Sequence, residues 1–149
     1  MKQLLLIMCM LSYVVFSKAQ NADVAEVKQV MKTYNQSIEK LDTTGITTLF
    51  TQNSVIFEEG SNEGNIERYL NHHLGPELKE FTSFKFNDYI INVVISGEYA
   101  FATETYTYDM VFSDNNKHIK SRGVSTSVLQ KTKQGWKIWQ SHTSYSDIK

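Results

Sequence analysis

Proline and cysteine are almost absent from this sequence of 149 residues. Pro76 is the only proline and Cys9 the only cysteine. A single cysteine excludes a disulfide within the chain, so a stable fold must depend on its apolar core. The sequence also lacks internal repeats, low-complexity runs and any visible linker. Its length therefore fits one domain.

A large excess of charge of one sign is also lacking. The chain has 15 basic and 16 acidic side chains. Domains that bind nucleic acid usually carry a strongly basic face. The composition therefore predicts no nucleic-acid partner.

The first 19 residues have the pattern of a secretory leader. Lys2 supplies the positive start, the stretch 4–16 is almost wholly apolar, and Ser17 and Ala19 are small residues at the positions a signal peptidase reads. The apolar stretch is shorter than the ~20 residues of a membrane-spanning helix. We predict a signal peptide over residues 1–19 and an exported domain over residues 20–149, periplasmic or extracellular and free of the membrane after cleavage. An uncleaved membrane anchor is the alternative.

Loss of this leader would change the chemistry of the chain. Cys9, Lys2 and Lys18 would leave with it, so 13 basic and 16 acidic side chains would remain. The exported domain would then contain no thiol and would carry a small negative charge.

Helical periodicity marks the beginning of the predicted domain. Apolar residues recur at spacings of three and four, which predicts a first helix with one buried stripe. A short second helix is expected over residues 44–50. A third is expected from Asn62 or Asn65 to Leu74, where Gly75 and Pro76 are expected to end it. The stripe of the first helix consists of Val24, Val27, Met31, Tyr34, Ile38 and Leu41.

From residue 81 onward the hydrophobic period changes to two, which indicates strands. Long strands are expected over residues 84–94, 99–112, 117–131 and 135–144, after a short strand over residues 54–57. Their short connections predict antiparallel neighbours. Three N-terminal helices followed by such strands predict an α+β fold, in which a cone-shaped, curved antiparallel sheet packs on the helices. The mouth of such a cone is a natural pocket for a small molecule.

Three residues of one expected strand offer polar groups to such a pocket. Glu104, Tyr106 and Tyr108 alternate along residues 99–112 and therefore share one face. If this face is concave, Glu104 and Tyr106 line the pocket with an acid and a hydroxyl donor. If it is convex, the three residues form cross-strand pairs on a wet surface. The sequence leaves both alternatives open.

Two histidines are further candidates for the pocket. His73 lies on the apolar stripe of the third helix, and strict alternation places His142 on the same face as Trp136 and Ile138. Each is expected to line the pocket as an acid, base or ligand, or else to be a satisfied inward histidine. A metal site that joins both to a carboxylate has no support from ligand spacing. We therefore predict no metal site and no cofactor.

The order of these elements resembles the SnoaL-like branch of the nuclear transport factor 2-like superfamily, which has a cystatin-like fold and includes the ketosteroid isomerases. The resemblance covers nearly the whole predicted domain. The segments that carry it are Tyr34 to Phe50, Gly64-Asn65-Ile66, Ala100 to Thr103, and Gly135 to Ile138 with His142 and Ser144.

The resemblance also implies roles for two residues. Tyr34 falls where the isomerases place a tyrosine that donates a hydrogen bond to the substrate carbonyl. Glu58 falls where they place the carboxylate that moves a proton. Their further acid, on the penultimate strand, has no match in residues 122–129. Tyr34 is alternatively a core aromatic residue, and Glu58 a solvated residue of a turn.

Three hypotheses about function follow. The leading one is an exported pocket domain that binds a small apolar or polyketide-like molecule. The second is a proton-transfer enzyme of isomerase or cyclase type at the same pocket, with Tyr34 and Glu58 as catalytic residues. The third is an assembly domain, because members of this superfamily often pair through the outer face of the sheet. We accordingly expect a homodimer.

Overall fold

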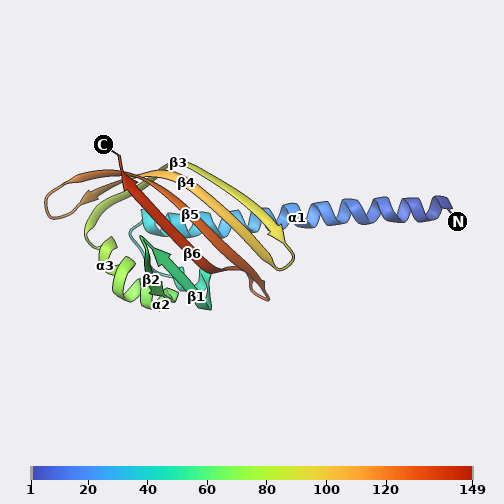
Figure 1. The fold of residues 1–149 in the computed structure, drawn as a ribbon, viewed down its shortest axis with the longest axis horizontal. Coiled ribbons are helices and arrows are strands. Elements are labelled where there is room, and N and C mark those ends of the chain that lie inside the picture. The colour runs from blue at the N-terminus through green and yellow to red at the C-terminus, as the bar shows by residue number, and fades with distance from the viewer. Residues whose placement is uncertain (1, 149) are drawn as a thin grey trace.

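The fold combines helices with one sheet, as the sequence predicts. The computed structural model describes the backbone of residues 2–148 and the side chains of residues 20–148. Figure 1 shows the long strands curving over the C-terminal half of the first helix, α1 (Lys2–Glu39), while its N-terminal half projects beyond the sheet. The predicted α+β class, with a curved sheet packed on helices, is confirmed.

The predicted leader lies outside the residues whose side chains are described. Cleavage after Ala19 therefore remains a prediction. Within the described part of the chain, no helix combines the length and the apolar character that crossing a membrane requires.

The C-terminal half of α1 forms one wall of the core. Val27, Met31 and Ile38 of the predicted stripe are buried against the inner face of the sheet. Burying each such side chain stabilises the fold by roughly 1.5–3 kcal/mol relative to exposure. Near its middle, α1 is tied to the sheet because Asp23 Oδ1 accepts hydrogen bonds from Trp136 Nε1 at 3.0 Å and Lys131 Nζ at 2.5 Å.

The other helices differ from the prediction in number and length. The expected second helix is a single 3₁₀ turn, η1 (Ile46–Leu49). The expected third helix is a continuous segment made of α2 (Ile66–Tyr69), the π-helical turn η2 (Leu70–Leu74) and α3 (Gly75–Leu78). Asn65 caps its start, since its side chain accepts a hydrogen bond from the Arg68 amide.

The prediction that Gly75 and Pro76 end this helix is wrong. The Gly75 N–H donates to the Leu70 carbonyl, five residues back, and so extends the segment through a π turn. Pro76 then stands in the first turn of α3, where its missing N–H costs little. The helical segment therefore continues to Leu78.

The sheet has six strands in the order β2-β1-β6-β5-β4-β3. Most neighbours are antiparallel, as predicted, and β1 and β6 form the parallel pair. The parallel pair arises because the helical segment carries the chain across the structure after β1 and β2. The strands are β1 (Phe50–Glu58), β2 (Ser61–Gly64), β3 (Phe81–Ser96), β4 (Tyr99–Phe112), β5 (His118–Thr132) and β6 (Gly135–Asp147).

Irregularities in two strands change which side chains face the core. In β3, Asn87 pairs with Thr107 but Ile90 pairs with Thr105, so one extra residue is inserted beside Asp88, which has a left-handed φ of 51°. In β6, the pairing jumps from Ile138 to Gln140 across Trp139. Each bulge reverses the inward and outward alternation of the residues that follow it.

Candidate functional site

A cavity opens between α1, the α2–α3 segment and the concave face of the sheet. Its polar walls include Glu58 from the end of β1, Tyr34 from α1, and Glu104 with Tyr106 from β4. The concave face of β4 therefore carries Glu104, Tyr106 and Tyr108, and the alternative of a wet surface is excluded. Four of the predicted site residues thus share one cavity.

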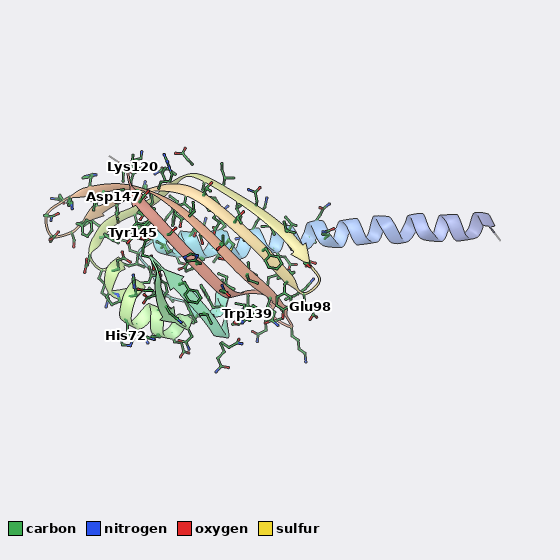
Figure 2. All side chains as sticks on the ribbon, viewed as in Figure 1. His72, Glu98, Lys120, Trp139, Tyr145 and Asp147 are labelled. Atoms are coloured by element: carbon green, nitrogen blue, oxygen red, sulfur yellow. The ribbon has the colours of Figure 1, made fainter. Side chains whose placement is uncertain are left out.

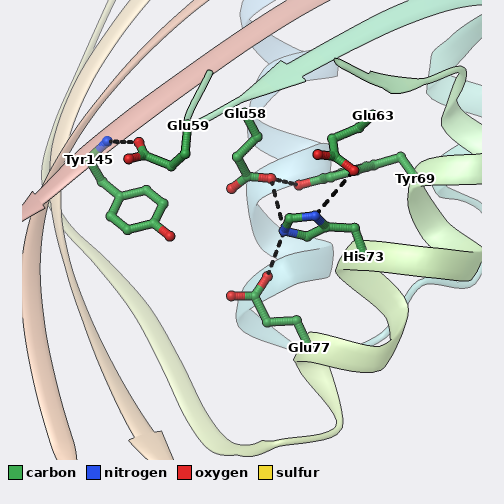
Figure 3. A network of polar contacts seen from close by, with 7 residues as sticks. All are labelled: Glu58, Glu59, Glu63, Tyr69, His73, Glu77 and Tyr145. Atoms are coloured by element: carbon green, nitrogen blue, oxygen red, sulfur yellow. Dashed lines mark hydrogen bonds and ion pairs between the residues drawn. The ribbon is translucent and has the colours of Figure 1, made fainter. Parts of the chain in front are cut away.

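Glu58 is positioned by two neighbours on the helical segment. Tyr69 Oη donates a hydrogen bond of 2.6 Å to Glu58 Oε2, and His73 Nε2 lies 3.5 Å from the same oxygen. Figure 3 shows the second carboxylate oxygen of Glu58 directed away from both partners. Burial raises the pKa of Glu58, while the Tyr69 hydrogen bond and His73 oppose the shift. A desolvated carboxylate with one free oxygen can act as a proton acceptor near neutral pH.

Tyr34 contributes a neutral donor to the same cavity. Its ring packs edge-on against Phe50, with 5.4 Å between the ring centroids. Burial raises its pKa strongly, and the negative charge of Glu58 adds to the shift. The hydroxyl therefore stays protonated and can donate a hydrogen bond to a bound molecule.

His73 lies among carboxylates at the back of Glu58. Its Nδ1 is 3.3 Å from Glu63 Oε2, and its Nε2 is 3.8 Å from Glu77 Oε2 (Figure 3). The imidazole contacts Glu58 and Glu77, which both line the cavity, but is not itself part of the wall. The prediction that His73 lines the pocket is therefore wrong, because the imidazole lies behind Glu58 and Glu77 and not in the wall itself.

Glu104 is the most deeply buried acid of the cavity, with 3% of its surface exposed. Its Oε1 accepts a hydrogen bond of 2.5 Å from Tyr89 Oη and one of 3.2 Å from Asn35 Nδ2. Burial raises the pKa of Glu104, and hydrogen bonds from Tyr89, Asn35 and Ser125 oppose the shift. All of these partners are neutral.

The ring of Tyr106 occupies the space that a side chain at Gly123 would fill. It pairs with Gly123 of β5, and a Cβ atom at Gly123 would lie 2.2 Å from the Tyr106 ring. Any side chain at position 123 would therefore force the Tyr106 ring to move.

The prediction that His142 lines the pocket is wrong. The bulge at Trp139 reverses the alternation in β6, so Ser141 is buried and Thr143 lines the cavity. His142 is exposed on the outer face, edge-on to Phe57 with ring centroids 6.5 Å apart. Among the described residues, no group of three side chains is arranged to hold a metal ion.

Sequence reasoning missed Tyr69, Tyr89 and Asn35 as partners of Glu58 and Glu104. A signal for Tyr89 exists in β3, where the inward apolar residues change from even numbers (Phe84, Phe86) to odd ones. Such a change of parity indicates a bulge. Tyr69 and Asn35 carry no comparable signal.

Glu104 gives a testable consequence for stability. The pKa of Glu104 is raised in the folded state above its ordinary value of 4.5. The stability of the fold therefore falls as the pH rises from 4.5 through the pKa of the folded state. We expect Glu104→Gln to raise the free energy of unfolding at pH 7 by about 1 kcal/mol. The gain should disappear below pH 4, where the carboxyl is protonated.

Denaturant unfolding at both pH values checks this prediction, with Glu98→Gln as the matched control. Glu98 lies in the exposed turn between β3 and β4 (Figure 2). A loss of stability at both pH values in Glu104→Gln would show that the carboxylate is needed structurally.

Comparison with known proteins identifies this architecture. The model of the SnoaL-like domain matches residues 27–147. A nuclear transport factor 2-like superfamily protein from Salmonella enterica serovar Typhimurium superposes with a TM-score of 0.74 at 21% identity, covering 87% of this chain and 93% of that one. A comparison of the sequence with curated proteins finds no match.

Two further solved structures share the fold. An NTF2-like protein with a cystatin-like fold from Novosphingobium aromaticivorans has a TM-score of 0.73 at 11% identity and covers 90% of this chain and 88% of that one. A ketosteroid isomerase-like protein from Erwinia carotovora atroseptica has a TM-score of 0.69 at 17% identity, covering 84% and 97%. At these identities the likeness shows the fold alone.

Proposed function

Because this chain belongs to the SnoaL-like domain family, we propose that its cavity binds a small, largely apolar molecule and that Glu58 moves a proton on the bound molecule. The observation that carries the proposal is the presence of Glu58 and Tyr34 in one cavity with apolar and aromatic walls. A pocket of this kind, with a few convergent polar groups and a perturbed acid, is typical of a ligand or active site.

The size of the cavity limits the molecule. The space open to the centre of a water molecule is about 90 Å³. Because this volume counts only positions of the water centre, the atoms of a bound molecule can extend about one water radius beyond it. A molecule with one ring and a short substituent fits this volume better than a fused polycyclic compound.

The proposed chemistry is a proton transfer next to a carbonyl group. The Glu58 carboxylate removes a proton from the carbon beside the carbonyl, and the Tyr34 hydroxyl donates a hydrogen bond to the oxygen where negative charge develops. The proton then returns from Glu58 to carbon. The name of the ketosteroid isomerase-like neighbour is consistent with this reaction class.

Binding can be tested separately from chemistry with phenylacetone, which has one ring and one ketone. We expect saturable changes in the NMR amide shifts of Tyr34, Glu58 and Tyr106 during a titration. Phe101, which is exposed on the outer face of the sheet, should not respond. Changes confined to the outer face, or no saturable change, would overturn the proposed pocket.

Export remains part of the proposal. It is supported by the leader-like pattern of residues 1–19 and by the projection of the N-terminal half of α1 beyond the sheet (Figure 1). The intact mass of the protein recovered after expression in an exporting host should correspond to a chain that begins at Gln20. A mass that includes Met1 to Ala19 would contradict it.

A homodimer is also proposed, and one observation favours it. The outer face of the sheet exposes large apolar side chains, including Val94 (64% exposed), Ile90 (59%), Phe101 (48%) and Val124 (48%). Pairing of two such faces would remove them from water. Sedimentation should show a dimer that Phe101→Glu dissociates, and a monomeric wild type would contradict the proposal.

A further inference from the structure

The cavity contains acids but no basic side chain in its wall. Three carboxyl groups line it, those of Glu58, Glu77 and Glu104, and no lysine, arginine or histidine is among the described residues that do so. His73 is the nearest basic group, and it touches Glu58, Glu63 and Glu77 from outside the wall. Of the three acids in the wall, His73 contacts Glu58 and Glu77, and no ion pair of the described residues includes Glu104.

No basic side chain among the described residues forms an ion pair with Glu104. Glu104 as a residue is 3% exposed, and the hydrogen-bond partners of its carboxyl group, Tyr89, Asn35 and Ser125, are all neutral. A buried carboxylate without a cation is costly and is usually paired. Its neutral donors fix its orientation, but they do not balance its charge.

Aromatic rings form the wall beside these acids. Phe84 stacks on Tyr108 with 5.2 Å between ring centroids, and Phe86 meets Tyr106 edge-on at 5.0 Å. Tyr145 continues the wall from Tyr108, at 6.0 Å. Aromatic faces attract organic cations, and desolvation strengthens this attraction.

We propose that the molecule bound in this cavity carries a positive charge, as a protonated amine attached to a small ring. The ammonium group would supply the cation that Glu104 lacks, while the ring lies against the aromatic wall. The same arrangement disfavours anions, because a bound carboxylate would face three acids. This inference refines the proposed function and depends on its cavity being a binding site.

Three ring compounds that differ mainly in charge test the inference. Benzylammonium, benzyl alcohol and benzoate are titrated at neutral pH and low salt into the wild-type protein, with binding measured by calorimetry and NMR. We expect the cation to bind at least about 10-fold more tightly than the alcohol, and benzoate not to bind. Glu104→Gln should remove most of the preference for the cation, and Glu98→Gln should retain it.

The outcomes separate this inference from the proposed function. If benzyl alcohol binds as tightly as benzylammonium, or if the preference survives Glu104→Gln, the inference fails but the pocket stands. Such a result would agree with a protonated Glu104 that donates to a neutral ligand. If neither these compounds nor phenylacetone binds, the proposed function fails as well.

Discussion

Glu58→Gln is expected to slow the exchange of the carbon-bound protons of phenylacetone by about 10²- to 10⁴-fold, which is the usual contribution of a general base. Glutamine keeps the shape of glutamate and can still accept the hydrogen bond from Tyr69, but it cannot take up a proton. The measurement is deuterium incorporation from D₂O next to the ketone, followed by NMR. The rates are compared with those of the wild-type protein and of buffer alone.

Glu59→Gln is the matched control for this experiment. Glu59 follows Glu58 in the chain, but its Oε1 accepts a hydrogen bond of 2.6 Å from the amide of Tyr145 (Figure 3). The control therefore removes the same charge from the adjacent position and should retain most of the rate. Phenylacetone binding to Glu58→Gln shows whether the pocket is intact. Equal exchange in wild type and Glu58→Gln would reduce the proposal to binding alone.

Gly75→Ala is expected to destabilise the protein by about 1–3 kcal/mol, the usual cost of overpacking. The Leu70 carbonyl accepts the Gly75 N–H across the π turn, and a Cβ atom at Gly75 would lie only 2.2 Å from that oxygen. Relief of this clash requires the backbone to move, since the obstacle is not the end of a flexible side chain. The same segment carries Tyr69 and His73, so their positions behind Glu58 should also change.

Pro76→Ala provides the matched comparison. Pro76 is exposed and stands in the first turn of α3, where its substitution should change stability by less than about 1 kcal/mol. Urea unfolding of both variants gives the difference in the free energy of unfolding. If Gly75→Ala costs no more than Pro76→Ala, then the π turn does not have the geometry described.

Several features of the fold could be predicted because a single physical pattern dominates each of them. The stripe of α1 is visible because Val27, Met31 and Ile38 recur at helical spacing and are buried. The long strands are visible because turn residues separate segments with a period of two. The order of these elements predicts the fold class, and the family resemblance carried by that order predicts that Tyr34 and Glu58 belong to one pocket.

The remaining features depend on local irregularities that composition does not encode. The bulge at Trp139 exchanges the faces of β6, and the polar residues that follow it, such as Ser141 and Thr143, give no hydrophobic signal of the change. His142 was therefore assigned to the wrong face. Gly75 and Pro76 have the composition of a helix end, but a π turn uses them inside the helix.

The inward face of β4 was also undecided, for a different reason. Glu104 is an acid in a buried position, and alternation alone cannot show that Tyr89 and Asn35 would supply its hydrogen bonds. Such partners come from other elements. Only the three-dimensional arrangement shows that the cavity has a buried acid, Glu104, separate from the half-buried Glu58.

The proposed proton transfer requires a desolvated Glu58 carboxyl beside an open cavity. The pKa of this carboxyl can be measured directly by NMR titration of protein labelled with ¹³C at the glutamate carboxyl groups. Assignment uses the signal that Glu58→Gln removes. We predict a pKa above the ordinary value of 4.5, because burial outweighs the hydrogen bond from Tyr69 and the contact with His73. A pKa at or below 4.5 would show a solvated or ion-paired carboxylate and would contradict the proposed role of Glu58.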